Sequence, residues 1–242
     1  MGLNSFKRYE KKFLVTKKQY EALIPELLKY MRYDRYCLDG QVYHIHNVYY
    51  DTIDNEIIRN STNKPPFKEK LRLRSYYENV SSNDLVYLEI KRKSMGVVTK
   101  RRVELTLDEA DAFINEGIRP QREDYTSKQI INEIGYFLSL YKAIPMVYIS
   151  YERIALFGKD NPDFRLTFDH HIITRRENVS LNSSVYGEDI LGEDNYVMEI
   201  KIEGALPLWL AQLLSSHQIY PVSYSKYGEE YNTLHECPFT YE

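Results

Sequence analysis

Cysteine, glycine and proline are all scarce in this chain, and each shortage excludes a class of protein. The 242 residues include only 2 Cys, 10 Gly and 9 Pro. Cys37 and Cys237 are too few for a disulfide framework and have no metal-ligand spacing, so we expect reduced structural thiols. The low glycine and proline content argues against long flexible linkers.

Long apolar segments are also missing. No apolar run approaches the roughly 18 residues that suggest a membrane span. The first residues, MGLNSFKRYEKK, do not include the apolar segment of a secretory signal. We therefore expect a globular protein of the cytoplasm.

Several familiar catalytic and binding motifs are not found. The sequence has no glycine-rich phosphate loop of the Walker or Rossmann kind and no nucleophile elbow. The pairs His44/His46 and His170/His171 have no matched cysteine or carboxylate spacing, so we interpret them as structural or surface histidines. The 23 tyrosines are scattered over different predicted elements rather than gathered into a stacking platform, so no nucleic-acid partner is expected.

Alternation of apolar and charged residues predicts a chain rich in β-strands. Between Leu71 and Leu105, the segments LRLRS, LEIKRK and KRRVEL place charges at every second position, which is typical of strands with two unlike faces. Six more segments are predicted to be strands, over residues 8–15, 42–51, 146–156, 164–169, 171–174 and 196–203.

Helices are predicted between these strands. Thr16 can cap a helix over residues 17–31, in which Pro25 should cause a kink or a break. Thr106 and Glu109 form a capping box for a helix that ends at Gly117. Further helices are expected over residues 51–60, 127–142 and 207–217, the last with Pro207 at its first position. The simplest fold is one α+β domain, residues 1–242, with an antiparallel sheet.

The charged faces of the predicted strands are strongly basic. They carry 11 basic and 6 acidic residues, a net +5 in a chain of net charge −3. Like charges about 4 Å apart repel by about 4 kcal/mol at an effective dielectric near 20, so this crowding is costly without an anionic guest. The residues are Arg8, Glu10, Lys12, Arg72, Arg74, Glu89, Lys91, Lys93, Lys100, Arg102, Glu104, Arg153, Arg165, Asp169, Glu199, Lys201 and Glu203.

Two structures fit these faces. One is an open sheet whose second face is solvated, the commonest cause of alternation. The other is a closed barrel with a cationic interior and helices on its apolar outside. Arginine and lysine would bind phosphate oxygens there, and carboxylates would recruit a divalent cation to the same phosphates. The recurrence of arginine and lysine favours the barrel, which would be a tunnel for a chain of phosphates.

Motifs from Arg8 to about Tyr231 resemble those of the triphosphate tunnel metalloenzymes, a CYTH-like superfamily. In chain order they are EKKFLV, VYYDT, KLRLRSY, YLEIKRK, TKRRVEL, YERIALFG with FRLTFD, YVMEIKIEG and SKYGEEY. More narrowly, the chain resembles the catalytic domain of the vacuolar transporter chaperone (VTC), the polyphosphate polymerase branch. The resemblance implies a closed eight-stranded antiparallel barrel with helices packed outside. It also implies a phosphotransferase that moves the terminal phosphate of ATP onto growing inorganic polyphosphate with Mn²⁺ or Mg²⁺.

The resemblance also implies roles for residues at matching positions. The catalytic, phosphate-binding residues would be Lys12, Arg72, Arg74, Lys91, Lys100, Arg153, Arg165 and Lys226. Further substrate-binding residues would be Arg8, Lys93, Arg102 and Lys201. Glu199 would be the principal metal ligand, with Glu10 and Glu89 in support.

Two departures from the family pattern bear on function. Tunnel hydrolases usually begin Glu-x-Glu-x-Lys, and here the first glutamate is replaced by Arg8, which disfavours hydrolysis and suits a polymerase. The eukaryotic proteins add an inositol-phosphate-sensing module and membrane helices, so we expect any membrane coupling to need a separate membrane-protein partner. A tunnel-fold triphosphatase and a non-catalytic polyphosphate-binding protein stay open as alternatives, and no oligomeric state is predicted.

Overall fold

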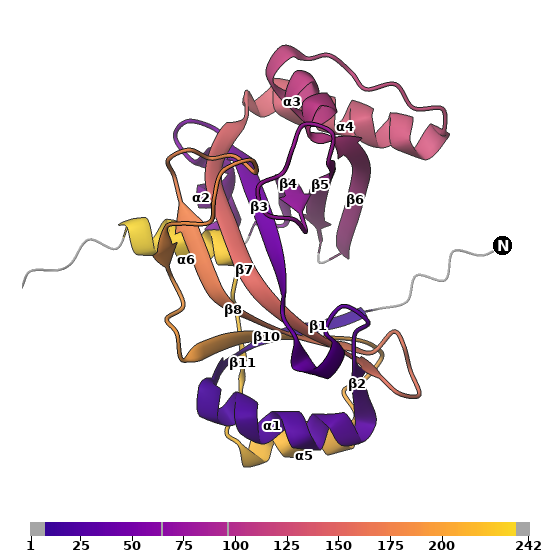
Figure 1. Ribbon diagram of the computed structural model, residues 1–242, viewed down its shortest axis with the longest axis vertical. Helices are drawn as coiled ribbons and strands as arrows, with labels where there is room; N and C mark the ends of the chain where they lie inside the picture. The colour runs from indigo at the N-terminus through magenta and orange to yellow at the C-terminus, as the bar shows by residue number, and fades with distance from the viewer. Residues whose placement is uncertain (1–7, 64, 96, 236–242) are drawn as a thin grey trace, which may run out of the picture. The chain divides into compact units, whose positions relative to one another are not determined.

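A computed structural model of the chain describes residues 8–63, 65–95 and 97–235 (Figure 1). It has six α-helices and an antiparallel sheet, which confirms the predicted α+β class. The chain divides into two compact units. Unit 1 comprises Met1–Tyr43, Tyr151–Ile172 and Leu191–Ser225, and unit 2 comprises His44–Ser150, Ile173–Ile190 and Lys226–Glu242.

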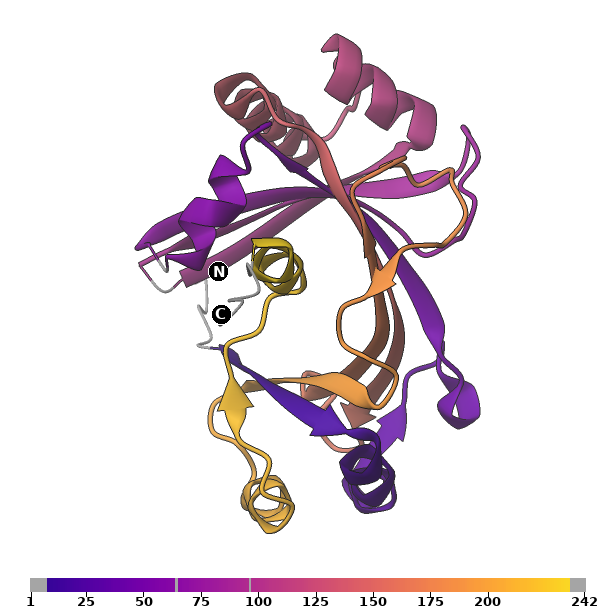
Figure 2. The same cartoon turned by 90° about the vertical axis from the view of Figure 1, so that its left-hand side faces the viewer.

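Unit 1 is built on strands paired in the order β11, β1, β10, β8 and β7, with β2 paired to β7. Their bounds are β1 Arg8–Thr16, β2 Met31–Tyr33, β7 Ile144–Gly158, β8 Arg165–Arg175, β10 Asn195–Glu203 and β11 Pro221–Val222. The helices are α1 (Lys17–Tyr30) and α5 (Leu208–Ser216), and a 3₁₀ turn, η1, covers Leu38–Gly40. The two α-helices lie side by side against this sheet in both views (Figures 1 and 2).

The core of unit 1 lies between its sheet and these two helices. Leu23 and Leu27 of α1 are buried with Phe13, Phe168 and Met198 of the strands. Thr16 and Gln19 form a capping box at the start of α1, as the threonine predicted. The helix runs unbroken through Pro25, so the predicted break does not occur, because burial of its leucine face holds the helix on both sides of the proline.

Unit 2 contains strands in the order β7, β3, β4, β5 and β6, with β9 paired to the end of β8. The bounds are β3 Tyr43–Asp51, β4 Phe67–Ser75, β5 Leu85–Ser94, β6 Val97–Thr106 and β9 Glu188–Asp189. Its helices are α2 (Glu56–Thr62), α3 (Leu107–Glu116), α4 (Tyr125–Tyr141) and α6 (Lys226–His235). Helices α3 and α4 cover one face of β4 to β6, where Leu73, Leu88 and Phe137 are buried in one cluster.

The helix boundaries agree closely with the sequence signals. The box of Thr106 and Glu109 starts α3, and Gly117 ends it in the left-handed region, at φ 75°. Pro207 is the capping residue of α5 rather than its first helical residue, and Asp124 caps α4. Helix α6 was not predicted, and α2 begins at Glu56, five residues later than expected, since Asp51 is the last residue of β3.

The closed eight-stranded barrel is not confirmed. The sheet has 11 strands, and in the part of the chain that the structure describes its two ends, β11 and β6, do not pair with each other. The three strands in excess of eight are β2, β9 and β11, which are only two or three residues long and too short to show a period-two pattern. The two strands predicted over residues 164–169 and 171–174 are one strand, β8 (Arg165–Arg175). In the described residues, no helix is long and apolar enough to cross a membrane.

Candidate functional site

Strand register brings the predicted site residues of unit 1 onto one face of its sheet. Lys12 on β1 lies opposite Glu199 on β10, and Glu199 lies opposite Thr167 on β8. In the next row, Glu10 lies opposite Lys201, and Lys201 opposite Arg165. Their chain neighbours, such as Phe13 and Met198, pack into the helix-covered core. The alternation in the sequence therefore translates into two faces as predicted.

Glu199 is a well enclosed carboxylate on this face. Its side chain is 12% exposed, and the Lys201 Nζ lies 2.6 Å from its Oε1. Burial raises the pKa of Glu199, but Lys201, Lys12 and Arg153 outweigh burial and lower it to about 2. The carboxylate is therefore ionised at neutral pH. Lys12 donates a hydrogen bond to the Tyr224 carbonyl at 2.9 Å, which ties it to the segment just after β11.

Arg153 on β7 is held in place by Asp169 on β8. Its Nε and Nη2 donate to the two carboxylate oxygens at 2.6 and 2.7 Å, a two-point contact that fixes the plane of the guanidinium group. Burial opposes the charge on Arg153, but Asp169 raises its pKa well above the ordinary value. Arg165 is exposed, with its guanidinium 4.6 Å from the centre of the Phe157 ring.

These side chains line one pocket in unit 1. Its wall combines three cations, two carboxylates and two hydroxyl groups, which is a lining that suits a phosphate with a divalent cation better than an apolar molecule. The lining residues are Asp34, Tyr43, Arg153, Ala155, Leu156, Phe157, Arg165, Thr167, Glu199 and Lys201.

In unit 2, a second cluster is centred on Glu89. This side chain is 1% exposed, and its Oε2 accepts hydrogen bonds from Arg72 Nε at 2.7 Å and Nη2 at 2.6 Å. Lys100 Nζ lies 2.6 Å from Oε1, and Arg102 Nη1 lies 4.0 Å from it. Burial raises the pKa of Glu89, but Arg72, Arg74 and Lys100 lower it to about 2. One buried carboxylate thus gathers three of the predicted cations.

The charge on Lys100 is less secure than those on the arginines. Burial lowers the pKa of Lys100 to about 8, and repulsion from Arg72 and Arg74 lowers it as well. Attraction to Glu89 raises the pKa but does not cancel the shift. A further phosphate nearby would favour the charged amine. The charge on Lys100, unlike that on the arginines, would therefore respond to an anionic ligand.

The remaining predicted residues of β4 and β5 differ in their surroundings. Arg74 is buried, and its Nε donates to Asn47 Oδ1 at 2.8 Å, while Asn47 donates to the Ile149 carbonyl. Lys91 and Lys93 are exposed, and Lys91 lies opposite Lys100 in the register of β5 and β6. The exposed lysines carry charge at the surface, whereas Arg72 and Arg74 are held rigidly.

Lys226 is the first residue of α6, and two buried contacts anchor that helix in unit 2. Arg176 donates to the Glu230 carboxylate at 2.6 and 2.9 Å. Tyr227 donates to Asp51 Oδ2 at 2.8 Å, and Asp51 also accepts the N–H groups that begin α2. The position of Lys226 therefore depends on contacts far away in the sequence.

Arg8 lies on β1 opposite Glu203, but its side chain is outside the part of the chain that the structure describes. Cys37 is buried and free, as expected, and Cys237 falls beyond the described residues. The sequence did not indicate Asn47, Tyr49 or Asp169 as partners of site arginines, although Tyr49 accepts a hydrogen bond from Arg72 at 3.2 Å. Tyr49 lies in the motif VYYDT and Asp169 in FRLTFD, but neither motif indicated these pairings.

The VTC domain model matches residues 7–235, which is nearly the whole chain. The chain belongs to the VTC domain family. Every residue with a predicted site role lies within the matched range.

Solved structures similar to this VTC domain support the same fold. A candidate adenylate cyclase from Bacillus halodurans is 18% identical, with a TM-score of 0.52 over 89% of this chain and 92% of that one. A candidate adenylyl cyclase from Hippeastrum, described as having a dominant triphosphatase activity, is 15% identical, with a TM-score of 0.54 over 96% of this chain and 98% of that one. At these identities the likeness concerns the fold. A search of curated proteins finds no match.

The carboxylates of the VTC domain differ in their suitability for Mn²⁺ or Mg²⁺, which prefer hard oxygen ligands. Glu199 is ionised and lines the pocket, and Glu10 lies diagonally across the strand pairing from it. These residues fit such an ion. Both oxygens of Glu89, in contrast, are already occupied by arginine and lysine.

Proposed function

We propose that this VTC domain is a metal-dependent polyphosphate polymerase that transfers the terminal phosphate of ATP to a growing polyphosphate chain. The observation that carries the proposal is the family match over residues 7–235. The replacement of the first glutamate by Arg8 supports a polymerase over a hydrolase. Each unit supplies a cluster of fixed cations, as phosphoryl transfer requires.

The residues of unit 1 would bind phosphate oxygens and a divalent ion. Glu199, with Glu10, would hold Mn²⁺ or Mg²⁺, which neutralises charge on phosphate oxygens when bound. Arg153 is oriented in advance by Asp169, and Lys12 and Lys201 are held near Glu199. Donors fixed before the reaction stabilise developing charge without reorganising.

The residues of unit 2 would neutralise further phosphate charge. Glu89 holds Arg72 and Lys100 in place, so we propose that it orients cations and that Glu199 is the metal ligand. Further positive charge would come from Arg165 in unit 1 and, in unit 2, from Arg74, Lys91, Lys93, Arg102 and Lys226. ATP and inorganic polyphosphate are the proposed partners.

A triphosphatase is the second candidate, because the Hippeastrum protein with the same fold is described as a triphosphatase. The two activities differ in their products. A polymerase makes long chains from ATP, whereas a triphosphatase releases phosphate without chain growth.

The deciding experiment incubates the purified protein with ATP and Mn²⁺, and resolves the products on a gel stained for polyphosphate while free phosphate is assayed. We expect a ladder that is lost in Glu199→Gln and retained in Glu193→Gln, a matched change on an exposed loop. Free phosphate with no ladder would identify a triphosphatase. No turnover, with triphosphate still bound, would identify a polyanion-binding protein.

A further inference from the structure

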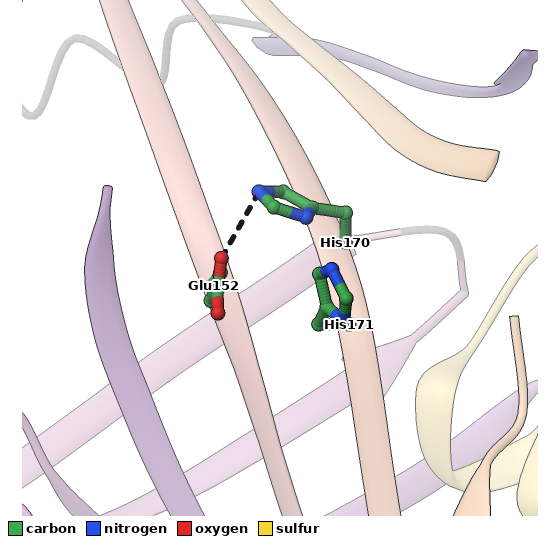
Figure 3. A group of neighbouring side chains, drawn as sticks. All are labelled: Glu152, His170 and His171. Carbon is green, nitrogen blue, oxygen red and sulfur yellow. Dashed lines mark ion pairs between the residues drawn. The ribbon is translucent and has the colours of Figure 1, made fainter. Parts of the chain in front are cut away.

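Unit 1 contains a group of metal-ligating side chains that plays no part in the proposed chemistry. Glu152 on β7 and His170 and His171 on β8 each offer one ligand atom, and these three atoms lie within 4.8 Å of one another. Figure 3 shows the carboxylate on one strand and both imidazole rings on the other. We propose that these residues bind a transition-metal cation of the Zn²⁺ type.

The distances suit such an ion. His170 Nε2 lies 3.4 Å from Glu152 Oε2. Ligands at about 2.0–2.2 Å from a tetrahedral zinc ion are about 3.3 Å apart, so these two atoms already have the required separation. All three ligand atoms lie within 4.8 Å of one another, which exceeds the required separation by at most about 1.5 Å, a shift that rotation of the His171 side chain can supply. Two imidazoles and one carboxylate also form a common set of three protein ligands for zinc, with a fourth position open.

The backbone explains how two consecutive histidines reach one carboxylate. Successive side chains of a regular strand point to opposite faces. His171 has φ 46°, in the left-handed region that non-glycine residues seldom adopt. The pairing of β8 with β10 ends at Asp169, just before the two histidines. Alternation is therefore interrupted here, and the two rings lie with their centres 5.0 Å apart.

The group is separate from the phosphate-binding face. Arg153 and Asp169 are the chain neighbours of Glu152 and His170, and by alternation they lie on the opposite face of β7 and β8 with Glu199. His170 instead lies 4.8 Å from Tyr196, ring centre to ring centre, and Tyr196 stacks on Tyr20 of α1. The proposed ion would thus lie on the helix-covered side, behind the ion pair of Arg153 and Asp169.

An ion at this position would link two neighbouring strands by direct coordination. It would also differ in type from the proposed Mn²⁺ or Mg²⁺, because imidazole suits zinc, copper and nickel, whereas carboxylate oxygens suit magnesium and manganese. The chain would therefore have two cation sites of different selectivity on opposite faces of one sheet, with the zinc ligands on β7 and β8 and the carboxylates for Mn²⁺ or Mg²⁺ on β10 and β1.

The test measures Zn²⁺ binding to the full chain by calorimetry, and Co²⁺ binding by visible absorption. We expect a site that loses more than about 100-fold in affinity in His171→Ala and in Glu152→Gln, since the loss of an outer-shell partner alone costs about 10–100-fold. Both residues are less buried than His170, so each variant should fold. Circular dichroism of each variant checks this.

Two further variants make the result specific. His44→Ala removes a histidine of unit 2 and should leave Zn²⁺ affinity unchanged. Glu199→Gln should also retain the Zn²⁺ site, which separates it from the ion of the phosphate-binding face. Wild-type affinity in both His171→Ala and Glu152→Gln, or loss of Zn²⁺ binding only in Glu199→Gln, would overturn the proposal.

Discussion

At the scale of single residues, buried carboxylates and an amide fix the positions of the cations. Glu89 holds Arg72 and Lys100, Asp169 holds Arg153, and Asn47 holds Arg74. A guanidinium with two such contacts loses little further freedom when a phosphate binds. Each polar partner orients a cation, and under the proposed function it would serve binding even where it touches no substrate.

Lys100 predicts a pH dependence. Its amine is charged below a pKa of about 8 and loses its charge above, whereas arginine stays charged throughout this range. We expect inorganic triphosphate to bind more weakly as pH rises through about 8. The measurement is calorimetric titration with triphosphate between pH 6.5 and 10.

Lys100→Arg is the matched control for this titration. It should move the loss of affinity to higher pH while leaving affinity at pH 7 within a few-fold of wild type. The effect of rising pH on stability has the opposite sign to its effect on binding. The unfolded chain keeps the Lys100 proton up to a higher pH than the folded protein does. The free energy of unfolding should therefore rise between about pH 8 and 10.5. An unchanged pH profile in Lys100→Arg would contradict the role of Lys100.

At the scale of elements, α6 is positioned by tertiary contacts rather than by its own sequence. The helix has ten residues, and in water an isolated helix of that length is marginal. Tyr227 and Glu230 anchor it through Asp51 and Arg176. Because Lys226 begins this helix, these anchors determine where its charge lies.

Tyr227→Phe tests this anchoring. The change removes a hydrogen bond to a buried carboxylate, which should lower the free energy of unfolding by about 1.5–3 kcal/mol. We also expect weaker triphosphate binding, since Lys226 loses its fixed position. Chemical denaturation and calorimetry check the two effects.

Tyr231→Phe, at a half-buried position of the same helix, is the control and should be close to neutral. If Tyr227→Phe destabilises the protein but binding is unchanged, Lys226 does not contribute to the site.

At the scale of the whole molecule, the candidate site residues are divided between the two units. Unit 1 contains Lys12, Arg153, Arg165, Glu199 and Lys201. Unit 2 contains Arg72, Arg74, Glu89, Lys100 and Lys226. Strands β7 and β8 each run on from one unit into the other. The single domain predicted from the sequence stays a prediction, and residues proposed to bind phosphate occur in each unit.

Thermal unfolding with triphosphate tests whether the cations of each unit contribute to binding. A ligand at 100 times its dissociation constant stabilises a protein by about 2.7 kcal/mol, so triphosphate should raise the Tm of the wild type. At the same triphosphate concentration, we expect a smaller rise in Lys201→Ala of unit 1 and also in Lys100→Ala of unit 2. Lys128→Ala, on an exposed position of α4, should respond like the wild type. A reduced rise in only one of the two site variants would confine binding to one unit.

Local sequence signals predicted much of this protein. Period-two alternation identified the longer strands and the residues that share a face, because side-chain direction in a strand depends only on position along it. Thr16 and Thr106 predicted the starts of two helices, since a capping box is satisfied within four residues. The family motifs likewise lie within short segments.

Only the tertiary structure decided the rest, because it depends on residues far apart in the chain. The sequence by itself determined that Arg72, Lys100, Arg153 and Glu199 lie on charged strand faces. Folding decided that Glu89 and Asp169 hold the cations, that α6 forms, and that the sheet has 11 strands. It also brought His170 and His171, which showed no metal-ligand spacing in the sequence, beside Glu152, since strand pairing places residues together regardless of their separation.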